Sequence, residues 1–291
     1  MMSMHTFSIV AHCAEEEAWG VAVASKFPAV GAVVPWARAG AGAVATQSYA
    51  KVGFGPDGLA LMSEGLSAAE ALSRLLEADE GRETRQVALV DAHGGGAAHS
   101  GSECHEWAGH FTGDGFSVQG NLLAGEAVIE AMAAGFRRAE GELADRLVAA
   151  LRAGENAGGD KRGKQSAAVL VARQNAGYGG DNDRYLDLRV DDAAEPVTDL
   201  IALVKLHHLY FQPPRAEDAI RIDEDIAREL QAIMIRQGYM TGEINGVWDE
   251  VCLQVFRMLI GNENLEMRWT TEKNRHSIDR VVLEYLRQRF G

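Results

Sequence analysis

The sequence predicts an α+β protein in which sheets with helices packed on them are followed by a small all-α region. From Thr6 to about Arg189, short apolar runs alternate with glycine-rich turns, a pattern typical of buried strands. Two helical patterns interrupt these strands between residues 125 and 153, so strands occur on both sides of a helical pair. After residue 217 the apolar residues recur at helical spacing. Together these features indicate sheets covered by helices, then a helical module.

The first elements are strands. Alternation in the segment Thr6 to Phe27, TFSIVAHCAEEEAWGVAVASKF, predicts two strands joined by an acidic turn. The runs VGAVVPWA and GAGAVATQSYA predict two more. A helix is predicted over Ser63 to Asp79, with Ser67 and Glu70 forming a capping box near its start.

Further elements follow in the same way. The glycines at 94–96 predict a hairpin between QVALVDA and AAHSG, and FSVQGN predicts another strand. Helices are predicted over residues 125–139 and 143–153, with a last helix at 196–210. The segments QSAAVLVAR and YLDLRVDD predict the strands between them. The prolines in FQPPRAEDA stop a helix, so we expect domains at 1–211 and 217–291.

Composition excludes several function classes. The 291 residues have a formal net charge of −14 without a basic block, which argues against nucleic acid as a partner. No apolar run is long enough to span a membrane, and the start MMSMHTFSIVAHCAEEE lacks signal-peptide features, so we expect a cytoplasmic protein with no membrane partner. The spacing of Cys13, Cys104 and Cys252 favours free thiols.

Thr6 is a candidate nucleophile because it begins the first strand, opposite the expected end of the second strand at Ser25 and Lys26. A threonine hydroxyl needs a base, commonly its own α-amine when it is the first residue, and the charge of Lys26 could assist. The alternative is that Thr6 starts a strand to which its branched side chain is suited, and that Lys26 is a solvated turn residue.

Other polar residues follow strand ends or occupy glycine-rich loops. An amide or backbone N–H near Gln47, Gln119 and Asn121 could stabilise an oxyanion. Further candidates for substrate binding are Asp181, Asp183 and Arg184. The alternative for both sets is a structural role in turns and buried ion pairs. The histidines between residues 93 and 110 lack metal-ligand spacing, and no phosphate loop occurs, so we expect neither a metal nor a cofactor.

A family resemblance now becomes specific. The segments TFSIVA, GVAVASKFPAVGAVVPWARAGAGAVATQSYA, GFGPDGL, DAHGGGAAHSG, WAGHFTGDGFSVQGNLLAG, GGDKRGKQSAAVLV and GYGGDNDRYLDLRVDD resemble the domain of unknown function 1028 family. This family is similar in fold to N-terminal-nucleophile (Ntn) hydrolases. The resemblance implies a four-layer αββα sandwich, amide hydrolysis, and a nucleophile at Thr6 with helpers at Ser25 and Lys26. Because MMSMH precedes Thr6, a free amine there requires self-cleavage after His5.

The C-terminal part resembles a peptidoglycan-binding-like module, a small three-helix bundle. The matching positions are Gln231, Gly238, Tyr239, Gly242, Gly246 and Trp248. The resemblance implies glycan binding, but a cytoplasmic protein would not meet the cell wall, so packing or self-association is the alternative. Exposed aromatic residues would favour binding, and buried ones would favour packing.

The leading hypothesis is an Ntn-type amidohydrolase acting on a small polar amide, with Thr6 as nucleophile and Asn121 or Gln47 near the oxyanion. The alternatives are a non-catalytic small-molecule binding protein and a binder of glycan or peptidoglycan fragments. The enzymes that the chain resembles often pair with copies of themselves, so we expect a homodimer.

Overall fold

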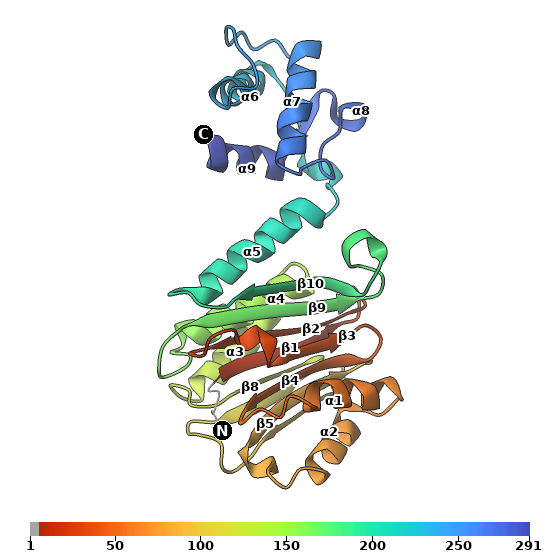
Figure 1. Ribbon diagram of the computed structural model, residues 1–291, viewed down its shortest axis with the longest axis vertical. Helices are drawn as coiled ribbons and strands as arrows, with labels where there is room; N and C mark the ends of the chain where they lie inside the picture. The colour runs from red at the N-terminus through yellow and green to blue at the C-terminus, as the bar shows by residue number, and fades with distance from the viewer. Residues whose placement is uncertain (1–5) are drawn as a thin grey trace. The chain divides into compact units, whose positions relative to one another are not determined.

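The computed structural model describes residues 6–291 (Figure 1). The chain forms two compact units, one ending at Val204 and the other beginning at Lys205. The division falls inside helix α5 (Pro196–Phe211). Within the described residues, no helix has both the length and the apolar character needed to cross a lipid bilayer.

The N-terminal unit contains a six-stranded antiparallel sheet with the order β10-β9-β2-β1-β8-β7. Its strands are β1 (Thr6–Cys13), β2 (Ala18–Ser25), β7 (Gly109–Gly113), β8 (Phe116–Gly120), β9 (Ser166–Arg173) and β10 (Arg184–Val190). The predicted hairpin is confirmed, because β1 pairs with β2 in a register that sets Thr6 opposite Ser25.

A second antiparallel sheet has four strands in the order of the chain. These are β3 (Pro35–Arg38), β4 (Gly42–Ser48), β5 (Arg85–Asp91) and β6 (Gly96–Ser100). Buried Val, Ala and Trp side chains from both sheets form one apolar cluster, including Val21, Val23 and Val90. The alternating apolar pattern of each strand explains this contact, since every second side chain points to the same face.

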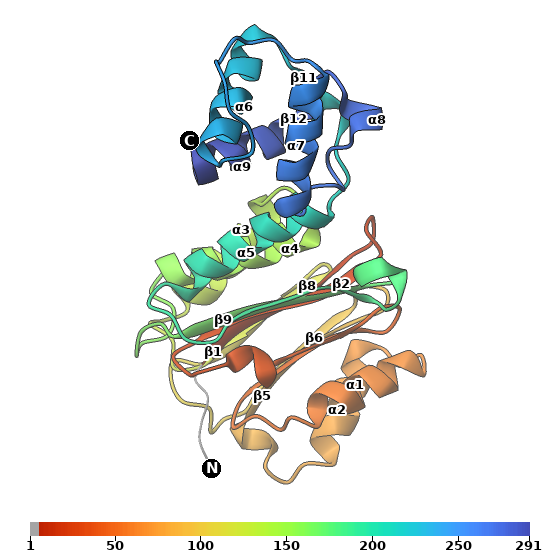
Figure 2. The same cartoon turned by 45° about the horizontal axis from the view of Figure 1, so that its top comes forward.

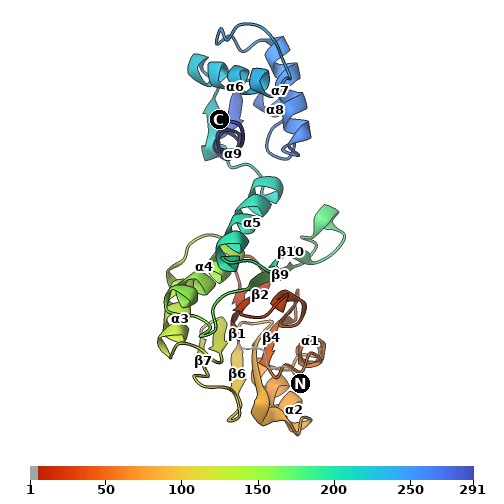
Figure 3. The ribbon, with the colours of Figure 1, turned by 60° about the vertical axis from the view of Figure 1, so that its left-hand side comes forward.

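Helices cover the other faces of the two sheets (Figures 2 and 3). They are α1 (Phe54–Ser63) and α2 (Ala68–Glu77) on the four-stranded sheet, and α3 (Ala127–Arg138) and α4 (Leu143–Asn156) on the six-stranded sheet. Single turns of 3-10 helix occur at Val30–Ala32, Arg82–Thr84, Tyr178–Gly180 and Ala216–Asp218.

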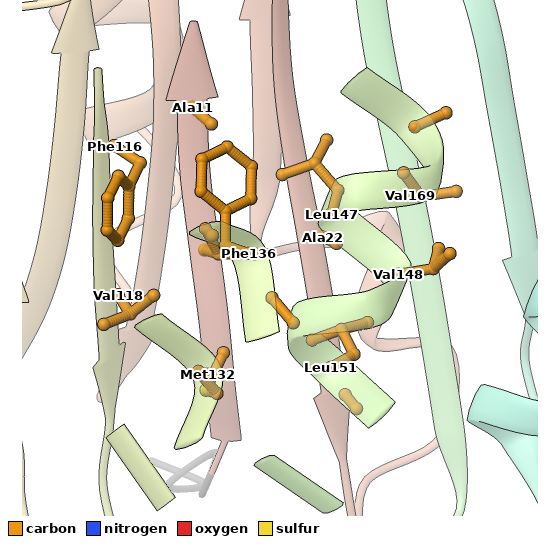
Figure 4. Packing of buried hydrophobic residues seen from close by; sticks show 14 of the residues in the cluster. Ala11, Ala22, Phe116, Val118, Met132, Phe136, Leu147, Val148, Leu151 and Val169 are labelled. Atoms are coloured by element: carbon orange, nitrogen blue, oxygen red, sulfur yellow. The ribbon is translucent and has the colours of Figure 1, made fainter. Parts of the chain in front are cut away.

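The larger apolar cluster lies between α3, α4 and the six-stranded sheet (Figure 4). Within it the rings of Phe116 and Phe136 lie 4.8 Å apart. Helix α4 also approaches β2 closely, because a Cβ on Gly20 would come within 2.6 Å of Leu147 Cδ1. The small residues of β2 therefore let the helix pack directly on the sheet.

Two local predictions were incomplete. The helix expected over residues 63–79 begins at Ala68, where Ser67 caps it with the predicted capping box. Helix α1, immediately before it, was not predicted, because its sequence FGPDGLALMS starts with helix-breaking residues. Its packing accounts for one of them, since a Cβ on Gly55 would lie 2.3 Å from the Trp36 ring.

The C-terminal unit is mainly helical. It contains α6 (Glu224–Arg236), α7 (Glu250–Asn262), α8 (Thr271–Asn274) and α9 (Arg280–Phe290), which enclose a separate apolar cluster. The all-α prediction needs correction, because β11 (Ala219–Arg221) and β12 (Ser277–Asp279) form a small antiparallel sheet. Strands of three residues are too short to give a recognisable alternating pattern.

Candidate functional site

A network of buried amide and hydroxyl side chains joins the two sheets near the start of β1. Ser8 on β1 donates to Gln47 Oε1 on β4 at 2.7 Å, and Gln47 Nε2 donates to Gln86 Oε1 on β5 at 2.8 Å. Asn121, which follows β8, donates to the same Gln86 oxygen at 2.9 Å. Gln119 on β8 donates to the carbonyl oxygen of Ala45 on β4 at 2.9 Å. The bonds of Ser8, Asn121 and Gln119 cross from the six-stranded sheet to the four-stranded one, and the Gln47–Gln86 bond joins neighbouring strands of the four-stranded sheet.

Thr6 is held inside this network. Its side chain is fully buried, and Oγ1 donates to Ser25 Oγ at 3.2 Å. Its carbonyl oxygen accepts from Gln47 Nε2 at 3.1 Å and from the Asn121 N–H at 3.0 Å. The backbone of Thr6 is thus held from both sheets, and its hydroxyl is held by the neighbouring strand β2. His5 and the predicted cleavage point before Thr6 lie outside the described residues.

Lys26 is fixed mainly through its backbone. Its N–H donates to Asp160 Oδ2 at 3.0 Å, and its exposed ammonium donates to the carbonyl oxygen of Lys164 at 3.2 Å. Asp160 is itself buried and paired with Arg162, 2.7 Å from Nη2. The carboxylate of Asp160 therefore links the end of β2 to the glycine-rich loop before β9.

A small cavity of about 80 Å³ lies beside Ser25. Phe7, Asp160 and Lys164 also line it, together with the glycines of the loop before β9. Ser25 lines the cavity and also accepts the hydrogen bond from the Thr6 hydroxyl, so the cavity is separated from Thr6 by one residue. It is the size of a small chemical group rather than of a complete ligand.

The buried amides act mainly on one another. Asn121 donates through both its backbone N–H and its side-chain amide, so both of the groups expected near an oxyanion already take part in the network. Gln86, which the sequence did not single out, is the centre of the network because Nε2 also donates to Ser100 Oγ and to the Gly120 carbonyl oxygen, both at 2.8 Å. Among the residues described, Gln119 Oε1 is a buried oxygen without a hydrogen-bond partner.

The other predicted binding residues lie elsewhere. Asp181 ends the 3-10 turn before β10 and is exposed. Asp183 Oδ1 accepts from the Asn175 N–H at 3.0 Å, and Arg184 pairs with Asp187 at 3.3 Å. Asp183 and Arg184 line a groove of about 600 Å³ that shares no lining residue with the cavity beside Ser25. The structure thus brings Thr6, Ser25, Gln47, Gln119 and Asn121 together without the residues of this loop.

The cysteines are buried free thiols. Burial raises the pKa of Cys13 to about 11 and also raises that of Cys104. Both are therefore thiols rather than reactive thiolates at neutral pH. Within residues 6–291, no three His, Cys, Asp or Glu side chains are grouped to hold a metal ion.

In the C-terminal unit, the buried side chain of Gln231 organises the glycine loop. Its Oε1 accepts from the N–H groups of Asn245 and Gly246 at 3.1 and 2.9 Å, and Nε2 donates to the Val247 carbonyl oxygen at 3.0 Å. Trp248 is half-buried, packs edge-on against Phe256 at 5.4 Å, and lines an open hollow of about 580 Å³. Its aromatic ring serves packing and remains partly accessible.

Comparisons with known proteins agree with this division of the chain. Residues 6–200 match the model of a family of unknown function, DUF1028, and residues 210–286 match one described as "Putative peptidoglycan binding domain". The crystal structure of the DUF1028 protein SPO2555 from Silicibacter pomeroyi is similar, with a TM-score of 0.64 and 32% identity over 71% of this chain and 90% of that chain. Curated proteins gave no match. The chain therefore belongs to the DUF1028 family and has a peptidoglycan-binding-like domain at its C-terminal end.

Proposed function

We propose that the N-terminal unit is a four-layer αββα sandwich of Ntn-hydrolase type and that it hydrolyses the amide bond of a small polar compound. The two sheets face each other across an apolar cluster, and helix pairs cover their other faces, which supports the architecture. The observation that carries the function is the position of Thr6. It begins the central strand β1, its hydroxyl bonds to Ser25, and its carbonyl oxygen is held by two donors.

The proposed reaction needs the peptide bond between His5 and Thr6 to be cleaved, which frees the Thr6 α-amine. The amine then takes the proton from Oγ1 as the oxygen attacks the substrate carbonyl carbon. The amide C–N bond breaks, the leaving amine takes up this proton, and an acyl ester forms on Thr6. Water hydrolyses the ester and restores the hydroxyl. Ser25 orients Oγ1, and Lys26 adds positive charge near the strand ends.

The test is the intact mass and N-terminal sequence of the purified full-length protein and its Thr6→Ala and Thr6→Ser variants. We expect the wild type and the serine variant to begin at position 6, and the alanine variant to keep the preceding residues, because alanine has no hydroxyl to attack the peptide bond. Ammonia release from glutamine, asparagine and their N-acetyl derivatives then measures turnover. A wild-type chain that begins at Met1 or Met2, or an alanine variant with an unchanged rate, would rule out this mechanism.

A second candidate function is small-molecule binding without catalysis. Thr6 is fully buried with its hydroxyl engaged, as in a structural strand residue, which favours this reading over catalysis in the intact chain. A protein that keeps its first residues and binds these amides without releasing ammonia would support it.

For the C-terminal domain, we propose binding of a peptidoglycan fragment, based on the family match and the partly accessible Trp248.

A further inference from the structure

The groove of about 600 Å³ described above is a hollow of the N-terminal unit that the network around Thr6 does not use. Residues of edge strand β3 form one wall, and residues of β9 and β10 form the other. Its volume is in the range of small-molecule binding sites. β3 and β10 are edge strands of different sheets, so the groove follows a side of the unit where neither sheet continues.

An aromatic ring in a fixed orientation contributes to one wall. Trp36 Nε1 donates to the Val33 carbonyl oxygen at 3.0 Å. Gly55 at the start of α1 also restricts the Trp36 ring, because a Cβ on this glycine would come within 2.3 to 2.4 Å of three ring atoms. The indole therefore lies directly against the helix backbone and cannot turn without moving α1. Pro35 and Leu59 extend this apolar wall.

The groove is also locally positive, although the whole chain has a net charge of −14. Arg189 pairs with Asp187 through two nitrogens at 2.9 and 3.2 Å, and Arg184 reaches the same carboxylate at 3.3 Å. Arg38 donates to Ser63 Oγ at 3.2 Å and, in the described part of the chain, forms no ion pair. Three guanidinium groups therefore share the groove with two carboxylates, those of Asp187 and Asp183.

We infer that this groove binds a small organic anion in which an oxyanion group, such as a carboxylate, is joined to a flat apolar ring. The side chains of Arg38 and Arg184 hold the oxyanion, because guanidinium groups match carboxylate geometry and their partial pairing leaves donors available. The indole of Trp36 packs on the ring. The inference is independent of the proposed hydrolase, since it uses none of the residues around Thr6.

The test is calorimetric titration of the full-length protein with benzoate, its neutral analogue benzamide, and inorganic phosphate. We expect saturable benzoate binding, and binding of benzamide at least about tenfold weaker, because only benzoate bonds to the arginines through a charge. Arg38→Gln and Arg184→Gln should each weaken benzoate about tenfold. The matched control is Arg138→Gln, which removes an exposed charge from α3 and should leave the affinity unchanged.

Other outcomes separate the parts of the inference. Phosphate binding that needs Arg38 and Arg184, without benzoate binding, would support the oxyanion site and refute the role of Trp36. The inference would be overturned if benzoate and benzamide bound with equal affinity, or if neither benzoate nor phosphate reached saturation. It would also be overturned if the control Arg138→Gln weakened benzoate binding as much as Arg38→Gln and Arg184→Gln. Light scattering that shows a dimer separated by Arg184→Glu would overturn it too, because a second copy of the chain would then occupy the groove.

Discussion

Replacing the central amide of the cross-sheet network tests whether that network stabilises the N-terminal unit. Gln86 is fully buried and accepts hydrogen bonds from Gln47 and Asn121 while donating to Ser100 and Gly120. A Gln86→Leu variant keeps a similar side-chain size but removes these bonds. A buried polar group that loses its partner costs about 1–3 kcal/mol, and the added apolar contacts recover part of the total. We expect the free energy of unfolding to fall by about 2–4 kcal/mol.

The assay is urea unfolding followed by hydrogen exchange and mass spectrometry on peptides from β1, β5 and β8, which separates this unit from the C-terminal one. The control is Gln165→Leu, because the Gln165 amide bonds to exposed Asp192 at 3.2 Å and lies outside the network. The control should change the free energy of unfolding by less than about 0.5 kcal/mol. A loss below about 1 kcal/mol in the Gln86 variant would refute the reasoning.

Two further predictions concern charged pairs. The guanidinium of Arg85 is the main cause that holds the pKa of Asp79 below its ordinary value of 3.8, so this pair stabilises the fold above that pH and loses its effect as the pH falls through the folded-state pKa. In the Asp79→Asn variant, the free energy of unfolding should therefore fall less steeply as the pH is lowered through the acid range. An unchanged pH dependence would contradict this. Arg268→Met should cost about 3–5 kcal/mol, because it leaves the carboxylate of Asp279, 2.9 Å away, buried and unpaired. Urea unfolding, followed by hydrogen exchange of peptides from α9, measures this loss of stability. An equal loss in Arg275→Met, which breaks an exposed ion pair, would argue against a cost that comes from burial.

Local features of the fold could be read from the sequence because they depend on neighbouring residues. The β1–β2 hairpin, the capping box at Ser67 and the helices after Gly125 all follow from residues within a few positions of one another. Helix α1 was missed because Gly55 and Pro56 oppose it locally, and packing against Trp36 overrides that preference. β7 (Gly109–Gly113) was also missed, because GHFTG has no alternating apolar pattern.

The candidate site was less accessible to prediction. Gln47 and Gln119 were identified from their positions near strand ends, but Gln86 sits in RQVALVD, where its neighbours suggest an ordinary buried strand. The Asn121–Gln86 and Gln119–Ala45 bonds, which join the two sheets, connect positions 35 and 74 apart in the sequence. A single sequence predicts which face of a strand is buried, but it does not predict how two sheets align across their interface.

The amide network also bears on how the sheets find a unique alignment. The facing surfaces consist largely of alanine and valine, whose contacts have no preferred direction, so several displaced packings would bury nearly the same apolar area. Hydrogen bonds from Gln47, Gln86 and Gln119 depend on direction and would all break in a displaced packing. The network therefore favours the native alignment of the two sheets over displaced ones during folding. In the native alignment it also sets the position of Thr6.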